Sequence, residues 1–295
     1  FAVFWVNGSV GQPNTISTGT ITGFPFCESA ATGASFSVPF TISGSFNSGN
    51  VFTAQLSDAG GNFGSPVTIG TLNGVNNGTI SATIPAGTLA GTGYRIRVNG
   101  SDPSTTGTDN GTDLVIHSTP TDPASASVNP TTVCSGASTI TLTATGGSAG
   151  SSGGELKWYE GGCGTGTYIG SGNGVTVTRT LTSSTTFYCR WESISCGNSA
   201  CASTTVTVNP ILPVSVYITA TSTTICEGSN VTFTAHPTNG GTPPTYQWNR
   251  NGTPLPGETG ATFTTNTLVN HDEITVTMTS TATCPNPATV TSEKL

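Results

Sequence analysis

Short runs in which apolar residues alternate with threonine recur along the chain and restrict it to β structure. Thr139–Thr145 reads TITLTAT, and Ile274–Met278 reads ITVTM. The branched Cβ of threonine suits an extended backbone while its hydroxyl can face water, so such runs predict half-buried strands of antiparallel sheets. Asn-Gly pairs, which favour tight hairpin turns, separate the runs at short intervals, and the 39 glycines and 18 prolines disfavour helices. An all-β protein is therefore predicted.

An internal repeat predicts how this β structure is divided. Cys134 and Cys226 lie in the related segments TVCSG and TICEG, about ninety residues apart, and each is followed by a strand and then by a tryptophan, Trp158 or Trp248. Cysteine followed by a core tryptophan is the order found in immunoglobulin-like sandwiches, so both indoles are predicted core residues. Cys27, in FPFCESA, opens a more divergent third unit without a core tryptophan.

Proline-containing joints at 118–123 and 209–213 separate the three units. The prediction is a rod of three tandem Ig-like antiparallel β-sandwiches that follows an N-terminal apolar strand. The expected boundaries are 1–13 for that strand, 14–118 for an Ig-like or fibronectin-like sandwich, and 119–210 and 211–295 for two Ig-like sandwiches.

Charge and cysteine content indicate where the protein works. Charged residues make up 7% of the chain, the net charge is −7, and lysine occurs only at Lys157 and Lys294, which excludes a nucleic-acid partner. The longest wholly apolar run has six residues, too short for a membrane-spanning helix. Eight cysteines without zinc-type spacing predict disulfides and hence an extracellular or cell-surface protein. Without an initiator methionine or leader, the chain is expected to be a processed product or an excerpt.

The cysteine positions suggest pairings within each sandwich. Cys226 and Cys284 are the only cysteines of the third sandwich, so they are expected to pair. By analogy, Cys134 should pair with Cys196 or Cys201, which leaves the other of these two for Cys163. Cys27 and Cys189 are single in their units, and two alternatives stay open for them: buried thiols or an inter-subunit bridge.

The opening segment FAVFWV is apolar on both faces of a strand and has to be covered. It could be an extra strand of its own domain, or the last strand of a preceding module. It could also be a donor strand, in which Phe1, Val3, Phe4, Trp5 and Val6 complete the sheet of a neighbouring molecule.

No catalytic, metal or cofactor site is predicted. Ser148 and Ser152 match Gly-x-Ser-x-Gly, but both lie in the low-complexity loop GGSAGSSGG rather than between a strand and a helix. The three histidines do not combine with a serine and an acid within one unit. The turn from Asp109 to Asp113 offers several oxygen atoms but lacks the closing Glu of an EF-hand loop.

Four segments resemble repeats of large surface proteins of Bacteroidota. They are GYRIRV (93–98), TGTDNGTDLVI (106–116), LKWYEGGCGTG (156–166) and TFYCRWES (186–193). In those proteins Ig-like modules are strung together in adhesins, gliding-associated filaments and cargo of the type 9 secretion system. The resemblance implies a surface or secreted location, a role in adhesion or structure, and no intrinsic catalysis.

The resulting hypothesis is a non-enzymatic extracellular structural protein, a subunit of a surface filament or adhesin stalk. It would assemble by strand donation or continue into further Ig-like modules, and its ligand would be a surface glycan or a host or cell ligand. The alternative is a set of carbohydrate-binding or spacer modules of a secreted polysaccharide-degrading enzyme. Sugar sites need exposed aromatic platforms, for which Trp191, Tyr159, Tyr168 and Tyr246 are the candidates.

Overall fold

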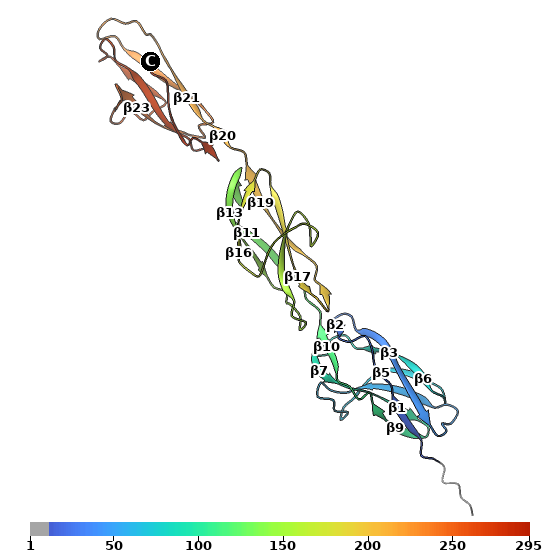
Figure 1. The fold of residues 1–295 in the computed structure, drawn as a ribbon. Coiled ribbons are helices and arrows are strands. Elements are labelled where there is room, and N and C mark those ends of the chain that lie inside the picture. The colour runs from blue at the N-terminus through green and yellow to red at the C-terminus, as the bar shows by residue number, and fades with distance from the viewer. Residues whose placement is uncertain (1–11) are drawn as a thin grey trace, which may run out of the picture. The chain divides into compact units, whose positions relative to one another are not determined.

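A computed structural model describes residues 12–295 and shows an all-β chain in which that part contains no helix (Figure 1). The described chain divides into two compact units. The first holds the chain up to residue 126 together with 144–173 and 188–203, and the second holds 127–143, 174–187 and 204–295. Phe1, Val3, Phe4, Trp5 and Val6, the expected assembly strand, lie outside the described residues.

The first unit contains a seven-stranded sheet in the order β5-β4-β8-β9-β1-β3-β6 and a three-stranded sheet in the order β2-β10-β7. Hairpins β14-β15 and β17-β18 complete the unit. Its strands are β1 (Thr15–Thr18), β2 (Phe26–Glu28), β3 (Ala34–Ser43), β4 (Val51–Leu56), β5 (Val67–Asn73), β6 (Gly78–Ile84), β7 (Gly91–Tyr94), β8 (Ile96–Ser101), β9 (Ser104–Asp109), β10 (Leu114–Ser118), β14 (Glu155–Glu160), β15 (Thr167–Ser171), most of β17 (Thr185–Ser193) and β18 (Gly197–Asn198).

Alternation along these strands builds the core of the first unit. In β6, Ile80, Ala82 and Ile84 are buried while the residues between them are exposed, because successive side chains of a strand point to opposite faces. Phe40, Phe52 and the other inward-facing residues of the two sheets form one apolar cluster.

The second unit is built in the same way from smaller sheets. They have the orders β11-β13-β16, β21-β22-β25 and β24-β23-β26-β28, and two short parallel pairs, β12-β19 and β20-β27, accompany them. The strands are β11 (Ser125–Asn129), β12 (Thr132–Cys134), β13 (Gly136–Thr145), β16 (Val175–Leu181), β19 (Ala202–Asn209), β20 (Leu212–Pro213), β21 (Ser215–Ala220), β22 (Val231–Thr238), β23 (Thr245–Arg250), β24 (Thr253–Pro254), β25 (Thr262–Thr265), β26 (Ile274–Thr279), β27 (Pro285–Asn286) and β28 (Thr289–Thr291).

Threonine and Asn-Gly fulfil the roles expected of them in this unit. Across β13 and β16, the hydroxyls of Thr139 and Thr178 lie 2.9 Å apart, which pairs the strands on their exposed face. Asn251 and Gly252 both have positive φ and join β23 to β24 in a two-residue hairpin turn. The expectation of an all-β, Ig-like fold is confirmed.

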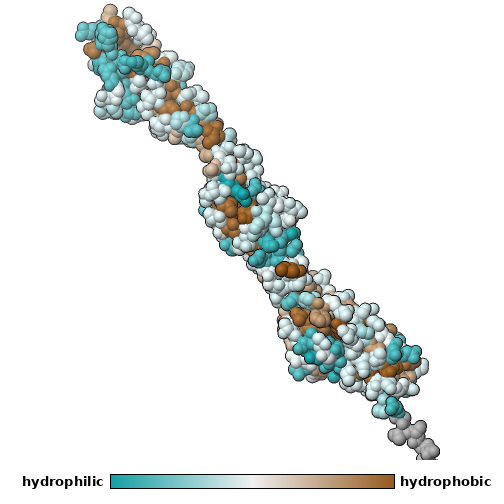
Figure 2. Space-filling view, in the orientation of Figure 1, coloured by the Kyte–Doolittle hydropathy of each residue, from teal (hydrophilic) through white to brown (hydrophobic). Residues whose placement is uncertain are grey.

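Figure 2 shows a surface coloured mostly white or teal, with scattered brown apolar residues between. Exposed apolar side chains include Leu89, Ile194 and Val269. Single apolar residues at a surface are ordinary in soluble domains, so these three define no interface by themselves.

Candidate functional site

Three disulfides join the cysteines in an arrangement that differs from the expected one. In the first unit Cys27 pairs with Cys196, and Cys163 with Cys201. In the second unit Cys134 pairs with Cys284. The bridges Cys27–Cys196 and Cys134–Cys284 span 169 and 150 residues of sequence, and we call them the long-range disulfides. Two cysteines remain free, Cys189, which is buried, and Cys226, which is exposed.

The expected pairing of Cys226 with Cys284 is therefore wrong, and the geometry of β26 explains why. Cys226 belongs to the loop that lies beside Ile274, where β26 begins, whereas Cys284 follows the end of β26 at Thr279. Six strand residues span roughly 17 Å, which is far beyond the reach of a disulfide. Sequence order alone does not reveal which end of a sandwich each loop occupies.

Cys134 was expected to pair with Cys196 or Cys201, which is also wrong. The parallel pairing of β12 with β19 places Cys134 opposite Asn209. Three residues later, the amide of Leu212 donates to the carbonyl of Cys284 at 2.9 Å. The short segment 209–212 thus holds the two cysteines of this bridge near each other.

Cys27 is likewise not a single thiol. Strand β2 pairs in parallel with β10, so Cys27 lies opposite His117 at the end of β10. Cys196 reaches it from the turn between β17 and β18. Cys163 pairs with Cys201, one of the two partners left open for it.

Cys189 is the buried thiol that one alternative described. It lies within β17 and is completely inaccessible to solvent. Burial raises the pKa of this thiol to about 11 because a thiolate would be poorly solvated there. Cys189 therefore stays protonated and unreactive at neutral pH.

The two predicted core tryptophans have the same environment in their respective units. Trp158 in β14 and Trp248 in β23 are both 0% exposed. The indole nitrogen of Trp158 donates to the carbonyl of Gly172 at 3.0 Å, and that of Trp248 donates to the carbonyl of Gly260 at 2.9 Å. Each buried ring thus has its one polar group satisfied by a backbone carbonyl, as a stable core requires.

The other aromatic candidates do not form a flat platform. Tyr159 is buried, and the exposed Tyr168 contacts it at a ring distance of 6.0 Å and an interplanar angle of 64°. Tyr246 is partly buried against the core of the second unit. Trp191 lines a cleft of about 490 Å³, where its indole nitrogen is buried and has no hydrogen-bond partner among residues 12–295.

A charged cluster around Glu192 is structural rather than catalytic. The carboxylate accepts hydrogen bonds from the hydroxyl of Tyr159 at 2.6 Å and from Nε of Arg190 at 2.8 Å, and Nζ of Lys157 lies 3.2 Å away. Burial and the bond to Glu192 raise the pKa of Tyr159 to about 12. At neutral pH this phenol cannot serve as a general base.

The serine motifs carry no catalytic arrangement in the described chain. Ser148 pairs with Thr121 through its backbone and its hydroxyl, and Ser152 accepts a hydrogen bond from Ser193 at 2.7 Å. His117 lies 3.2 Å from the hydroxyl of Ser151, yet no carboxylate hydrogen-bonds His117 within residues 12–295. A serine beside a histidine without an orienting acid does not make a triad.

Metal chemistry finds no support in the described residues either. Within residues 12–295, no three histidine, cysteine or acidic side chains are grouped closely enough to hold a metal ion. The guanidinium of Arg95 fills the turn from Asp109 to Asp113, with Nε 2.7 Å from the carboxylate of Asp113. A cation at that position would compete with this ion pair.

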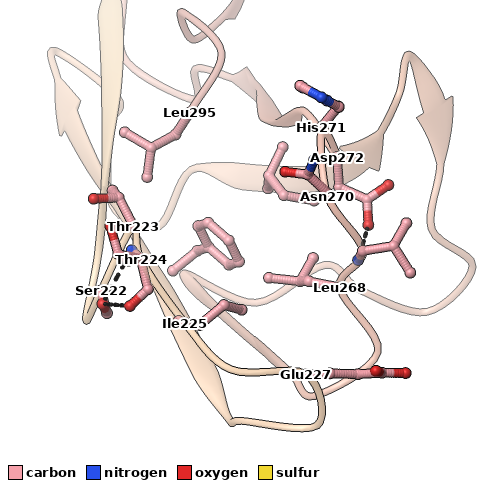
Figure 3. A pocket seen from close by; sticks show the side chains of 13 residues that line it. Ser222, Thr223, Thr224, Ile225, Glu227, Leu268, Asn270, His271, Asp272 and Leu295 are labelled. Carbon is pink, nitrogen blue, oxygen red and sulfur yellow. Dashed lines mark hydrogen bonds between the residues drawn. The ribbon is translucent and has the colours of Figure 1, made fainter.

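The largest cleft lies in the second unit and has a volume of about 790 Å³ (Figure 3). Its walls come from the loop between β21 and β22, the loop between β25 and β26, and Leu295. Figure 3 shows Ile225, Leu268 and Leu295 pointing into the same space. The full lining is Ser222, Thr223, Thr224, Ile225, Glu227, Phe233, Leu268, Val269, Asn270, His271, Asp272, Ile274 and Leu295.

Asp272 fixes one wall of this cleft. Its carboxylate accepts hydrogen bonds from Arg250, from the amide of Val269 at 2.7 Å, and from Nδ2 of Asn251 at 2.8 Å. The bond from Arg250, followed by those from Val269 and Asn251, lowers the pKa of Asp272 to about 2 even though burial acts in the opposite direction. The side chain is 5% exposed, so these bonds are shielded from water.

We expect Asp272→Asn to destabilise the second unit by about 1–3 kcal/mol, because the buried Arg250 loses a charged partner. A pKa below the ordinary value means that the ionised form stabilises the fold above about pH 4, and that this contribution is lost as the pH falls toward 2. Urea unfolding followed by circular dichroism between pH 2 and pH 7 measures both effects. Asp102→Asn on an exposed turn is the control. Equal stability of Asp272→Asn and wild type at pH 7 would contradict the role of this network.

Comparison with known proteins identifies the class of fold. Residues 120–210 match the family model of the Ig-like domain CHU_C associated, a Bacteroidota-type Ig module. The resemblance inferred from the sequence is confirmed, and the chain carries Ig-like modules of this kind. No curated protein gives a significant match.

Several solved structures are similar at low identity. The full ectodomain of mouse nectin-like molecule 4 is 15% identical, with 83% of this chain and 92% of that one covered and a TM-score of 0.32. A chain from a study of a 1.5-MDa bacterial ice-binding adhesin is 16% identical, with 96% of both chains covered and a TM-score of 0.37. Fibronectin(III)-like modules of Clostridium thermocellum CbhA are 12% identical over 67% of this chain and 95% of that one, with a TM-score of 0.29. At these TM-scores, the likenesses carry no functional inference.

Among residues 12–295, no helix is long and apolar enough to cross a membrane.

Proposed function

We propose that the chain is a non-enzymatic structural protein of the cell surface, part of an adhesin stalk or surface filament. Its modules are 14–118, 119–210 and 211–295, preceded by the strand 1–13. The Ig-like module fold and the three disulfides support an extracellular or surface location.

The long-range disulfides are the observation that carries this proposal. With these boundaries, Cys27–Cys196 joins the first module to the second, and Cys134–Cys284 joins the second to the third. The polypeptide itself also passes from module to module beside each bridge, near Ser118 and near Asn209. Two covalent connections at each step restrict the hinge motion that single linkers between domains allow. This is a property that a load-bearing stalk needs and an enzyme does not.

The remaining chemistry agrees with a structural role. The described serines, histidines and carboxylates are engaged in turns, ion pairs and sheet contacts, and the strongly shifted groups Tyr159, Cys189 and Asp272 are held by packing or by hydrogen bonds. Low surface charge reduces the repulsion between neighbouring copies of the chain. The adhesive ligand would be a surface glycan or a host or cell ligand.

Assembly through Phe1–Val6 is the finer part of the proposal. Six consecutive apolar residues, three of them aromatic, favour an extended strand and need a covered groove. We expect deletion of residues 1–10 to abolish filaments visible by negative-stain microscopy and to leave a soluble monomer. Replacing Asn7–Val10 alone with Gly-Ser-Gly-Ser is the control and should leave filaments intact. Filaments of unchanged length and stability after the deletion would show that the strand serves only its own domain.

A further inference from the structure

The two long-range disulfides repeat one geometry. In each, the first cysteine lies on a short strand that pairs in parallel with the last strand of its own module: Cys27 is opposite His117 on β10, and Cys134 is opposite Asn209 on β19. A backbone hydrogen bond of 2.8 Å extends each pairing, from Thr119 to Glu28 and from Ser135 to Asn209.

The second cysteine of each bridge also occupies an equivalent place. Cys196 and Cys284 lie in the turns that follow β17 and β26. A serine at the end of each strand anchors the turn: the hydroxyl of Ser193 accepts from the amide of Cys196 at 3.1 Å, and the hydroxyl of Ser280 accepts from the amide of Ala282 at 3.2 Å. Each module thus offers a first-type cysteine to the module after it, and each later module offers a turn cysteine to the one before.

Cys226 is the third cysteine of the first type. Its segment TICEG repeats TVCSG around Cys134, and its thiol is exposed and unbonded. The two equivalents of Cys226 in the same chain are both bonded.

The residue before each first-type cysteine shows a second difference. Phe26 and Val133 are 5% and 9% exposed, whereas Ile225 is 37% exposed and lines the 790 Å³ cleft (Figure 3). The segment before Cys226 therefore lies open, unlike its two counterparts.

We propose that Cys226 forms a disulfide with the turn cysteine of a further Ig-like module, repeating the two long-range disulfides. This inference rests on the modular architecture of the proposed function and names the partner of its third module. A second copy of this chain offers no suitable cysteine, since six of the eight, all within the described residues, are already bonded and Cys189 is buried. The partner module belongs either to the same polypeptide or to another one.

The chemistry is that of ordinary disulfide formation. The two thiols lose two protons and two electrons, and a small-molecule or protein disulfide takes up both and is reduced to two thiols. Because Cys226 is exposed, such an oxidant has access to it.

The test extends the full chain with a second copy of residues 209–295 placed after Leu295, with Cys226→Ser in the added copy. The protein is oxidised with glutathione disulfide and digested without reduction. We expect one Cys284 peptide linked to Cys134 and the other linked to Cys226. The unextended chain should instead keep one maleimide-reactive thiol, at Cys226, while Cys189 reacts only after denaturation. In the extended chain, Cys226→Ser should leave the added Cys284 reactive.

Two outcomes would overturn the proposal. One is an extended chain in which Cys226 and the added Cys284 stay free while the three existing bridges form. The other is a chain joined to a second copy through a Cys226–Cys226 bridge. Protein isolated from the cells that make it gives an independent check: Cys226 should react with maleimide only after reduction, and a reactive Cys226 there contradicts the proposal. Non-reducing electrophoresis of the native protein separates a partner on another polypeptide, which adds mass, from one on the same polypeptide. None of these outcomes decides the structural role, which the filament experiment tests separately.

Discussion

Reduction of the disulfides should more than double the length to which the chain can be stretched. With the bridges intact, the shortest covalent path from Phe1 to Leu295 crosses Cys27–Cys196 and leaves out the residues between them. It contains about 125 of roughly 294 peptide steps, so the fully extended chain reaches about 430 Å when oxidised and about 1,000 Å when reduced. Single-molecule stretching between the two termini, with and without reductant, measures both lengths.

Two variants make this experiment specific. Removing Cys163–Cys201 by serine substitution at both positions should leave the oxidised length unchanged, because that bridge does not shorten the shortest path. A chain with Cys27→Ser and Cys134→Ser should reach the full length without reductant. An oxidised wild-type chain that extends to about 1,000 Å would show that neither long-range disulfide bears load.

Trp248→Ala should destabilise the second unit by about 3–5 kcal/mol, which is a large share of the stability of a small sandwich. The indole is completely buried, and its ring centre lies 6.1 Å from that of Phe233 and 5.8 Å from that of Phe263. Truncation would leave a cavity between the sheets and an unpaired carbonyl at Gly260. Urea unfolding followed by circular dichroism gives the free energy.

Tyr217→Ala is the matched control, because the ring of Tyr217 is 59% exposed in the same unit. We expect it to change the free energy of unfolding by less than about 0.5 kcal/mol. A loss well below 1 kcal/mol for Trp248→Ala would mean that the indole is accessible in solution, and the carbohydrate-binding alternative would then gain support.

Local patterns predicted the strands and the core well. Alternation of apolar residues with threonine predicted β13 and β26, Asn251-Gly252 forms the expected hairpin, and Trp248 is buried. These features depend on neighbouring residues and on the two-residue period of a strand, both of which a sequence displays directly.

Disulfide pairing could not be predicted in the same way. It depends on which end of a sandwich each loop occupies, and Cys27 and Cys196 are 169 residues apart. One signal was present: Cys196 and Cys284 each follow the first cysteine of their own repeat by about sixty residues. That regularity fits two arrangements, pairing within modules or pairing displaced by one module. The parallel strands β2 and β12, which position the first cysteines, are too short for periodicity to show.

Peptide mapping of the oxidised protein without reduction tests the central claim most directly, because two covalent connections per module step are what the proposed stalk rests on. The structure predicts linked peptides for Cys27–Cys196, Cys134–Cys284 and Cys163–Cys201, with Cys189 recovered as a thiol only after denaturation. Recovery of Cys226 linked to Cys284, or of Cys134 linked to Cys196 or Cys201, would place the bridges within single modules and contradict the account.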